Sequence, residues 1–221
     1  DRGCLAVCPE GALQAGPDGI KIDRARCQGC GRCAEVCPSS ALEVHGRKMT
    51  VRDLFEEVAR DAAFFAQSGG GVTLSGGEPL LQAAASAALL RLLRARGIST
   101  ALDTCGGASE QAWQEVLPWV DLVLFDIKTV DPEKHRTFTG IPFERVQKSA
   151  EIVDASGIET WVRTPVIPGY TDDEASIRNV AQFVGKTFHR CTRHDLLAFS
   201  NLCTAKYAQL NMPFALDGAR L

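Results

Sequence analysis

Apolar and polar residues alternate along most of the chain in a way that predicts helices and strands in turn. Residues 51–66 carry apolar side chains at helical spacing. Short apolar runs predict strands at 71–74, 98–103, 120–125, 158–166 and 195–199. Further helices are predicted at 80–96, closed by Gly97, at 108–117, in segments between 132 and 156, and at 172–186. The run 120–125 is apolar throughout, which predicts a strand buried on both faces.

Strand and helix alternate five times after residue 50, with short connections. This alternation predicts an α/β fold of parallel β/α units, arranged as an open or closed barrel. Residues 1–46 instead lack long periodic stretches and are rich in Cys and Gly. We therefore expect two domains, a small metal-held unit at 1–46 and a barrel at 47–221.

Composition excludes several functional classes. The 221 residues suit one medium or two small domains, and the net charge of −3 gives no reason to expect nucleic acid or an anionic membrane as partner. No apolar run approaches the roughly 20 residues of a membrane span. The chain opens Asp1-Arg2-Gly3-Cys4, without a signal peptide and without an initiator Met. We expect a cytoplasmic protein whose natural N-terminus lies upstream.

Cysteine spacing is the strongest chemical signal in the chain. Six of the nine cysteines fall within residues 4–37, which in a chain without a targeting signal favours metal ligation over disulfides. Cys27, Cys30, Cys33 and Cys37 form the C-x2-C-x2-C-x3-C-P run of bacterial ferredoxins, and the upstream pair Cys4 and Cys8 repeats its second half. Zinc is the alternative, because C-x2-C pairs also hold zinc. The four-cysteine spacing, with a proline after each terminal cysteine, favours iron–sulfur clusters.

In two-cluster ferredoxins the fourth cysteine of each run binds the other cluster. By this rule Cys27, Cys30 and Cys33 share a cluster with Cys8, which makes one complete set. Cys4 and Cys37 would serve a second cluster with two upstream cysteines, and one of these would fall at position 1, where the sequence has Asp1. The second cluster is therefore lost or altered, or the register differs near the start of the chain.

Polar residues follow the predicted barrel strands. Gly76 and Gly77 follow the strand predicted at 71–74 and would let a ligand approach the backbone closely, although a tight turn explains such a pair equally well. Asp103, Asp126 with Lys128, and Arg163 end the next three strands. The carboxyl ends of parallel strands are where such folds bind ligands. A solvated loop or a structural ion pair between Asp126 and Lys128 remains the alternative, but charges at several successive strand ends favour one shared polar ligand.

Together with the double cysteine motif, four segments resemble the glycyl-radical-enzyme activating proteins, which are radical S-adenosylmethionine (SAM) relatives of pyruvate formate-lyase activating enzyme with a ferredoxin-like insert. The segments are GVTLSGGEPLLQ (71–82), LDTCG (102–106), DLVLFDIK (121–128) and VRTPVIPGYTD (162–172). The resemblance covers essentially the whole chain, and it implies a partial (β/α) barrel of the radical SAM type with a ferredoxin-like iron–sulfur insert.

The resemblance also implies roles for the strand-end residues. The segment Gly76, Gly77, Glu78 and Pro79 would bind the amino group of SAM, and Asp103 would help to hold its methionine moiety. The motif Asp126-Ile127-Lys128 would contact SAM as well, and Arg163 would lie at the next strand end. We expect Lys128 and Arg163 to be the residues closest to catalysis.

The sequence departs from the family at two places. The family's C-x3-C-x2-C motif, which binds the catalytic cluster after the first barrel strand, does not occur in these 221 residues. We therefore expect the first strand and this motif to lie upstream, and the chain alone to be inactive. The second departure is Ser200, which stands where relatives often have a His, and Cys203 replaces a usual Gly, although Lys206 and Tyr207 fit the family again.

The implied activity is the generation of a glycyl radical on a partner glycyl radical enzyme. A reduced [4Fe–4S] cluster would cleave SAM to methionine and a 5′-deoxyadenosyl radical, which abstracts a hydrogen from a backbone glycine of the partner. Flavodoxin or ferredoxin would supply electrons, and the insert clusters would relay electrons or support the partner interface.

Two other functions remain open from the sequence. The first is another radical SAM enzyme, acting on a small molecule or peptide. The second is a ferredoxin-type electron-transfer module on an inert barrel. The strand-end charges at Asp103, Asp126, Lys128 and Arg163 argue against the second, since a scaffold does not need them.

Overall fold

The chain divides into two compact units. The computed structural model describes residues 2–210, 212–216 and 218–219. Contacts separate Asp1–Met49 and Ala205–Phe214 from a larger unit of Thr50–Thr204 and Ala215–Leu221. The domain boundary predicted after residue 46 stays a prediction, and the division adds a C-terminal segment to the small unit.

The small unit contains short elements and almost no apolar core. Its strands β1 (Leu13–Gly16) and β2 (Gly19–Ile22) form an antiparallel hairpin, and its helices are α1 (Gly3–Val7), α2 (Arg32–Glu35) and nearly all of α10 (Thr204–Gln209). Among its described residues, Cys4 and Ala12 alone are buried and hydrophobic. A core of this size is too small to stabilise a folded unit. The small unit therefore fits the expectation that a metal group holds it together.

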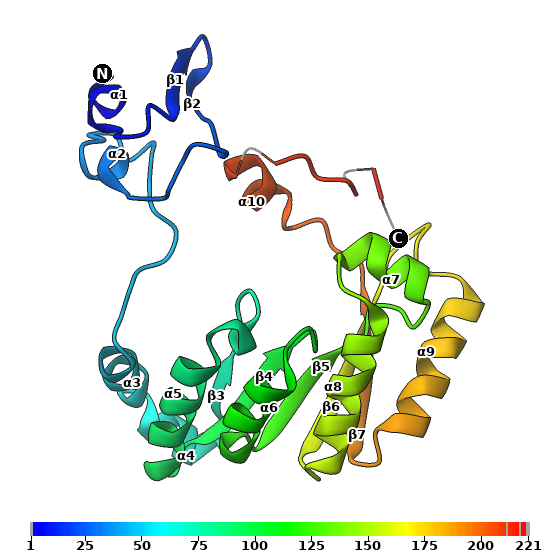
Figure 1. Cartoon of the computed structure of the whole chain (residues 1–221). Helices are drawn as coiled ribbons and strands as arrows, with labels where there is room; N and C mark the ends of the chain where they lie inside the picture. The colour runs from blue at the N-terminus through cyan, green and yellow to red at the C-terminus, as the bar shows by residue number, and fades with distance from the viewer. Residues whose placement is uncertain (1, 211, 217, 220–221) are drawn as a thin grey trace. The chain divides into compact units, whose positions relative to one another are not determined.

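The large unit is a five-stranded parallel sheet with helices between the strands (Figure 1). The strand order is β3-β4-β5-β6-β7, and every pairing between these strands is parallel, as the alternating pattern predicts. Its elements, in chain order, are α3 (Val51–Ala59), α4 (Ala62–Ser68), β3 (Gly71–Leu74), η1 (Pro79–Gln82), α5 (Ala83–Ala95), β4 (Ser99–Thr104), α6 (Glu110–Val116), η2 (Leu117–Trp119), β5 (Leu122–Asp126), α7 (Pro132–Thr139), α8 (Phe143–Ala155), β6 (Glu159–Val166), α9 (Glu174–Thr187) and β7 (Cys191–Ala198).

Local side-chain chemistry explains where the helices begin. Thr50 and Asp53 form a capping box at the start of α3, and Asp131 accepts hydrogen bonds from two backbone N–H groups of α7. The single helix predicted over 51–66 is wrong, because Asp61 leaves the helical conformation and separates α3 from α4. The last strand begins at Cys191 rather than Asp195. It lies at the sheet edge, where Thr192 and Arg193 face solvent, so its first residues do not form the apolar run on which the prediction relied.

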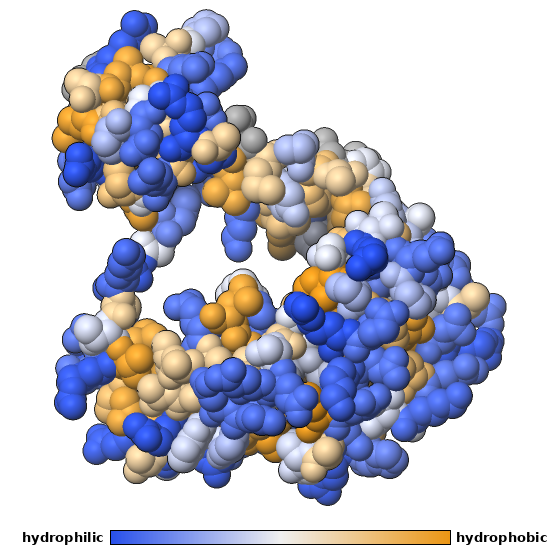
Figure 2. Space-filling model, viewed as in Figure 1, coloured by the Kyte–Doolittle hydropathy of each residue, from blue (hydrophilic) through white to orange (hydrophobic). Residues whose placement is uncertain are grey.

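The core lies between the sheet and the helices. Helices α5, α6, α8 and α9 cover one face of the sheet (Figure 1), and buried residues alternate with more exposed ones along β4, β5 and most of β6. The visible outer surface of α8 and α9 is mostly hydrophilic (Figure 2). Burial in β5 alternates, so the prediction of a strand buried on both faces is wrong: Val123 and Phe125 are buried, whereas Leu122 and Leu124 are half-buried. The second face of the sheet is therefore partly open.

A series of buried hydrogen bonds connects the loop after β4 to helices α6 and α8. The indole N–H of Trp113 donates to Ser149 Oγ at 2.8 Å, and this hydroxyl donates to the carbonyl of Gly106 at 2.7 Å. Trp113 and Ser149 are almost completely buried. The hydroxyl thus satisfies a donor and an acceptor that water does not reach.

Ser149→Ala should lower the free energy of unfolding of the large unit by about 1–3 kcal/mol, because it leaves the Trp113 N–H and the Gly106 carbonyl unpaired. Denaturant unfolding followed by tryptophan fluorescence measures this, since Trp113, Trp119 and Trp161 all lie in the large unit. The control is Lys148→Ala, the adjacent exposed position on α8, which should change stability by less than about 0.5 kcal/mol. Equal stabilities of the two variants would show that the Ser149 hydrogen bonds do not stabilise the large unit.

Candidate functional site

Three charged side chains meet where β4, β5 and β6 end. Parallel pairing places Asp103 beside Leu124 of β5 and Asp126 beside Arg163 of β6. Arg163 Nη2 lies 2.7 Å from Asp126 Oδ1 and also binds Asp103 Oδ1, while Nε donates to Asp126 Oδ1 at 2.9 Å. All three side chains are between 21% and 24% exposed. One guanidinium therefore bridges two carboxylates from neighbouring strands.

The remaining oxygens of both carboxylates have partners too. Lys128 Nζ lies 3.2 Å from Asp126 Oδ2, so the structural ion pair that the sequence left open exists. Ser75, at the end of β3, donates its hydroxyl to Asp103 Oδ2 at 3.0 Å. Burial alone would lower the pKa of Arg163, but the charges of Asp126 and Asp103 raise that pKa above its ordinary value. Arg163 is thus held as a permanent cation in this cluster.

Glu78 ties the loop after β3 to the end of β4. Its carboxylate accepts hydrogen bonds from the backbone N–H of Cys105 at 2.9 Å, from Thr104 Oγ1 at 2.9 Å and from the N–H of Leu80 at 3.2 Å. The thiol of Cys105 donates to it at 3.2 Å. The Glu78 carboxylate is therefore already hydrogen-bonded within the protein. The loop offers an approaching ligand mainly its backbone.

Two glycines leave that backbone open. Gly76 adopts φ +125°, which only glycine takes without strain. Gly77 has no such conformation, and a Cβ built there would meet no atom within 4 Å. Nothing in the described protein requires Gly77 to lack a side chain, so the open space beside it fits a ligand that approaches the loop closely.

Two further predicted contacts are buried. Pro79 begins η1 and is buried beside Leu80. The Ile127 side chain lies in the hydrophobic core, and its N–H donates to the Arg163 carbonyl at 2.9 Å. The Ile127 side chain is therefore part of the core and does not itself face a ligand.

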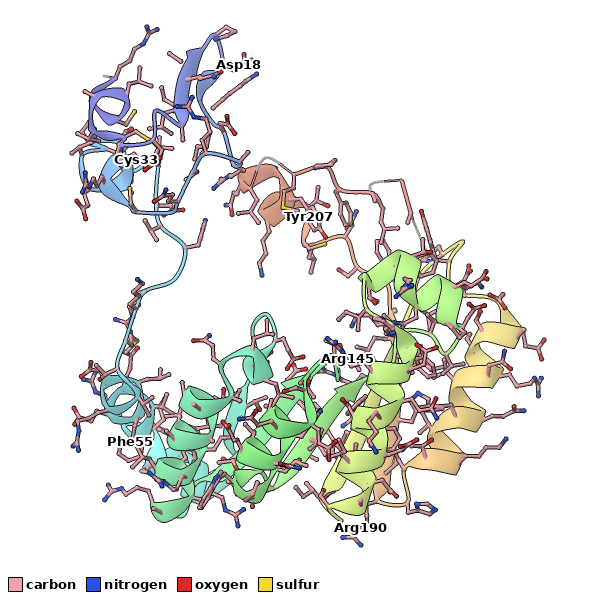
Figure 3. All side chains as sticks on the ribbon, in the orientation of Figure 1. Asp18, Cys33, Phe55, Arg145, Arg190 and Tyr207 are labelled. Atoms are coloured by element: carbon pink, nitrogen blue, oxygen red, sulfur yellow. The ribbon has the colours of Figure 1, made fainter. Side chains whose placement is uncertain are left out.

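The cysteines of the small unit separate into two sets. Cys8, Cys27, Cys30 and Cys33 line one cavity of about 360 Å³, and Cys4 and Cys37 do not. Cys33 of α2 is labelled in Figure 3. Burial raises the pKa of Cys33, and the nearby Cys27 and Cys30 raise it further. Cys4 is buried in α1, Cys37 lies beside Ser39 at 3.7 Å between Sγ and Oγ, and Asp1 lies outside the described residues.

The donor chemistry of this cavity fits a cluster better than a single ion. Over the described ranges 2–210, 212–216 and 218–219, no three His, Cys, Asp or Glu side chains converge tightly enough to hold one metal ion. In a [4Fe–4S] cubane each iron takes its own thiolate, so four sulfurs around a cavity need not converge on one point. Four thiols around one cavity are the required donor set.

Other polar residues have structural contacts. His135 is buried and bonds the Ile141 carbonyl at 2.7 Å, His189 pairs with Asp154, and His194 bonds Thr164. The exposed Ser200, at the family's usual His position, accepts a hydrogen bond from the N–H of Leu202 at 3.4 Å. Sequence reasoning assigned no role to Ser75 and Thr104, although both lie within the quoted segments 71–82 and 102–106, and their hydroxyl groups were the signal for them.

The family model described as "Radical SAM superfamily" matches residues 24–180, and the family model described as "4Fe-4S dicluster domain" matches residues 2–41. The isethionate sulfite-lyase activating enzyme of Desulfovibrio desulfuricans is 43% identical over 208 residues, covering 92% of this chain and 66% of the relative. The (2S)-3-sulfopropanediol dehydratase activating enzyme of Klebsiella oxytoca is 34% identical over 221 residues, covering 99% of this chain and 70% of the relative. The chain thus spans about two thirds of the length of these curated relatives.

Solved structures agree with this assignment of the fold. A domain of the pyruvate-formate lyase-activating enzyme from Bacteroides vulgatus is 30% identical, with a TM-score of 0.55 over 64% of this chain and 92% of that domain. Streptococcus suis SuiB bound to S-adenosylmethionine has a TM-score of 0.51 at 17% identity over 70% of this chain and 37% of that protein, which supports the fold alone. In the described part of the chain, no helix combines the length and apolar character that crossing a membrane requires.

The contact between Glu78 and Cys105 has a measurable consequence. Burial and the neighbouring Glu78 raise the pKa of the Cys105 thiol. Glu78→Gln removes the charge that disfavours the thiolate, so Cys105 should react faster with iodoacetamide at mildly alkaline pH. Peptide mass spectrometry follows each cysteine separately, and Cys191, which lies far from Glu78 in the sequence and bonds the Arg193 carbonyl, serves as the control. An unchanged Cys105 rate would contradict the contact.

Proposed function

Because the chain belongs to the radical SAM superfamily, in the group of activating enzymes for glycyl radical enzymes, we propose that the complete protein uses SAM and a reduced [4Fe–4S] cluster to generate a glycyl radical on a partner enzyme. The observation that carries the proposal is the charged cluster at the ends of β4, β5 and β6, in which Arg163 bridges Asp103 and Asp126. The inert-barrel alternative gives no reason for this cluster.

The net charge of the strand ends complements that of SAM. Glu78, Asp103 and Asp126 supply three negative charges, and Lys128 and Arg163 supply two positive charges, which leaves one negative charge. SAM carries an ammonium, a sulfonium and a carboxylate, and so has one net positive charge. Desolvating that ligand is favourable only where the protein supplies the opposite charge.

The contacts suggest a division of roles among the charged residues. Asp103 Oδ2 accepts a hydrogen bond from the rotatable Ser75 hydroxyl, which can yield to a ligand ammonium. Lys128 Nζ makes one ion pair and has further N–H groups for a carboxylate. Arg163 is held by both aspartates, so we assign it the role of orienting them. Gly76 and Gly77 would present backbone carbonyls to the ligand ammonium.

The iron–sulfur chemistry divides between two places. The bound, reduced catalytic cluster supplies the electron that cleaves SAM to a radical able to take hydrogen from a glycine of the partner. In this chain, Cys8, Cys27, Cys30 and Cys33 would hold an insert cluster that passes electrons or supports the partner interface. Cys4 and Cys37 would contribute to a second cluster.

Flavodoxin or ferredoxin would donate electrons in the cytoplasm, where thiolates stay reduced. Neither nucleic acid nor a membrane would take part.

Asp103→Ala and Lys128→Ala should each weaken SAM binding by the complete protein roughly tenfold to a hundredfold, because each loses a charge-assisted hydrogen bond worth about 1.5–3 kcal/mol. Anaerobic calorimetry measures SAM affinity, and thermal melting of the same samples measures stability. The matched control is Lys134→Ala, which breaks an ion pair with Asp173 at 3.6 Å outside the strand-end cluster. It should leave SAM affinity unchanged.

If Lys128 serves only its ion pair with Asp126, Lys128→Ala will lower the melting temperature and leave SAM affinity intact. Unchanged affinity in both variants would show that SAM does not bind at the strand ends, and the proposed site would be withdrawn.

A further inference from the structure

The cavity lined by the four thiols is completed by residues from the far end of the chain. Gln209 and Leu210, at the end of α10, line it together with Cys8, Cys27, Cys30 and Cys33. All of these residues belong to the small unit. The cysteine motif therefore builds the cavity with help from a segment more than 170 residues downstream.

Arg24 holds the end of α10 against this cavity. Its Nη2 donates to the Gln209 carbonyl at 3.2 Å, and Arg24 itself lines the cavity. The last carbonyls of a helix lack intrahelical partners and carry partial negative charge, so a guanidinium is a suitable cap. The bond spans 185 positions in the sequence, and it fixes the residue that follows the helix.

The segment after α10 folds back on the helix. The N–H of Leu210 bonds the Lys206 carbonyl at 3.0 Å, and that of Met212 bonds the Tyr207 carbonyl at 2.9 Å. The rings of Tyr207, labelled in Figure 3, and Phe214 lie 4.8 Å apart. These contacts give Leu210 a defined position, although 42% of it is exposed.

We propose that Leu210, held in place by the bond between Arg24 and Gln209, covers the insert cluster and limits the access of water and oxidants to it. The proposal rests on the proposed ligation by Cys8, Cys27, Cys30 and Cys33. Reduction adds negative charge to a cluster that four thiolates already make negative, so excluding water disfavours the reduced form and lowers the reduction potential. An apolar side chain over the cavity also slows attack by small molecules.

The test uses the 221-residue chain, reconstituted anaerobically with iron and sulfide. Leu210→Ala should make the visible cluster absorption bleach several-fold faster in air or with an iron chelator, and it should shift the midpoint potential of the cluster to a less negative value. The cluster of Arg24→Gln should bleach faster as well. The midpoint potential of this variant does not test the proposal, because the substitution also removes a positive charge near the cluster. The matched control is Leu202→Ala, which removes a leucine that is 88% exposed and does not line the cavity.

Iron and sulfide content separates failure of this proposal from failure of the ligation beneath it. Cys30→Ala should lose most of the cluster, and full retention of iron would overturn the ligation itself. If Cys30→Ala loses the cluster but Leu210→Ala shows the bleaching rate and midpoint potential of the wild type, Leu210 does not cover the cluster. The proposed ligation by the four cysteines would still hold. Equal acceleration by Leu202→Ala would also overturn the cover, because the effect would then not depend on the cavity.

Discussion

The salt bridge from Arg163 to Asp103 and Asp126 is the interaction on which the strand-end site depends. Parallel pairing of β4, β5 and β6 brings two carboxylates to neighbouring strand ends, where they would repel each other in a partly buried environment. One guanidinium between them removes that repulsion and fixes both side chains. Lys128 and Ser75 can then bind the outer oxygens. The result is a set of charges that is pre-organised before any ligand binds.

The two units obtain their stability from different sources. The large unit has a continuous core between sheet and helices, with Trp113, Phe125 and Val162 fully buried. The small unit has almost no buried apolar side chain among its described residues, and its cysteines surround a cavity instead. Metal binding can supply folding free energy that a small core lacks. The sheet of the large unit thus provides a rigid support for the charges at its strand ends, and the small unit is organised around the group that it would bind.

The sequence predicted the strand-end residues because the argument needed only the order of parallel strands. Asp103, Asp126 and Arg163 each follow an apolar run, and such ends gather at one edge of a sheet. It did not predict which groups they would contact, and the saturation of Glu78 by Thr104 and Cys105 depends on how two loops pack. The alternating burial of β5 was missed because both of its faces carry apolar residues, and one faces the open side of the sheet. Leu210 could not be placed at the cysteine cavity, since no local pattern reports a contact across the chain.

The activity that we propose for the complete protein is the generation of a radical on a glycine of another protein. The most direct measurement is electron paramagnetic resonance of a candidate glycyl radical enzyme, incubated anaerobically with the complete protein, SAM and a reductant. We expect an organic radical signal on the partner, split into a doublet by the single remaining α-hydrogen, together with 5′-deoxyadenosine. If 5′-deoxyadenosine instead forms from SAM with hydrogen taken from a small-molecule substrate, and no glycyl radical enzyme offered acquires a protein radical, the proposed activity is wrong.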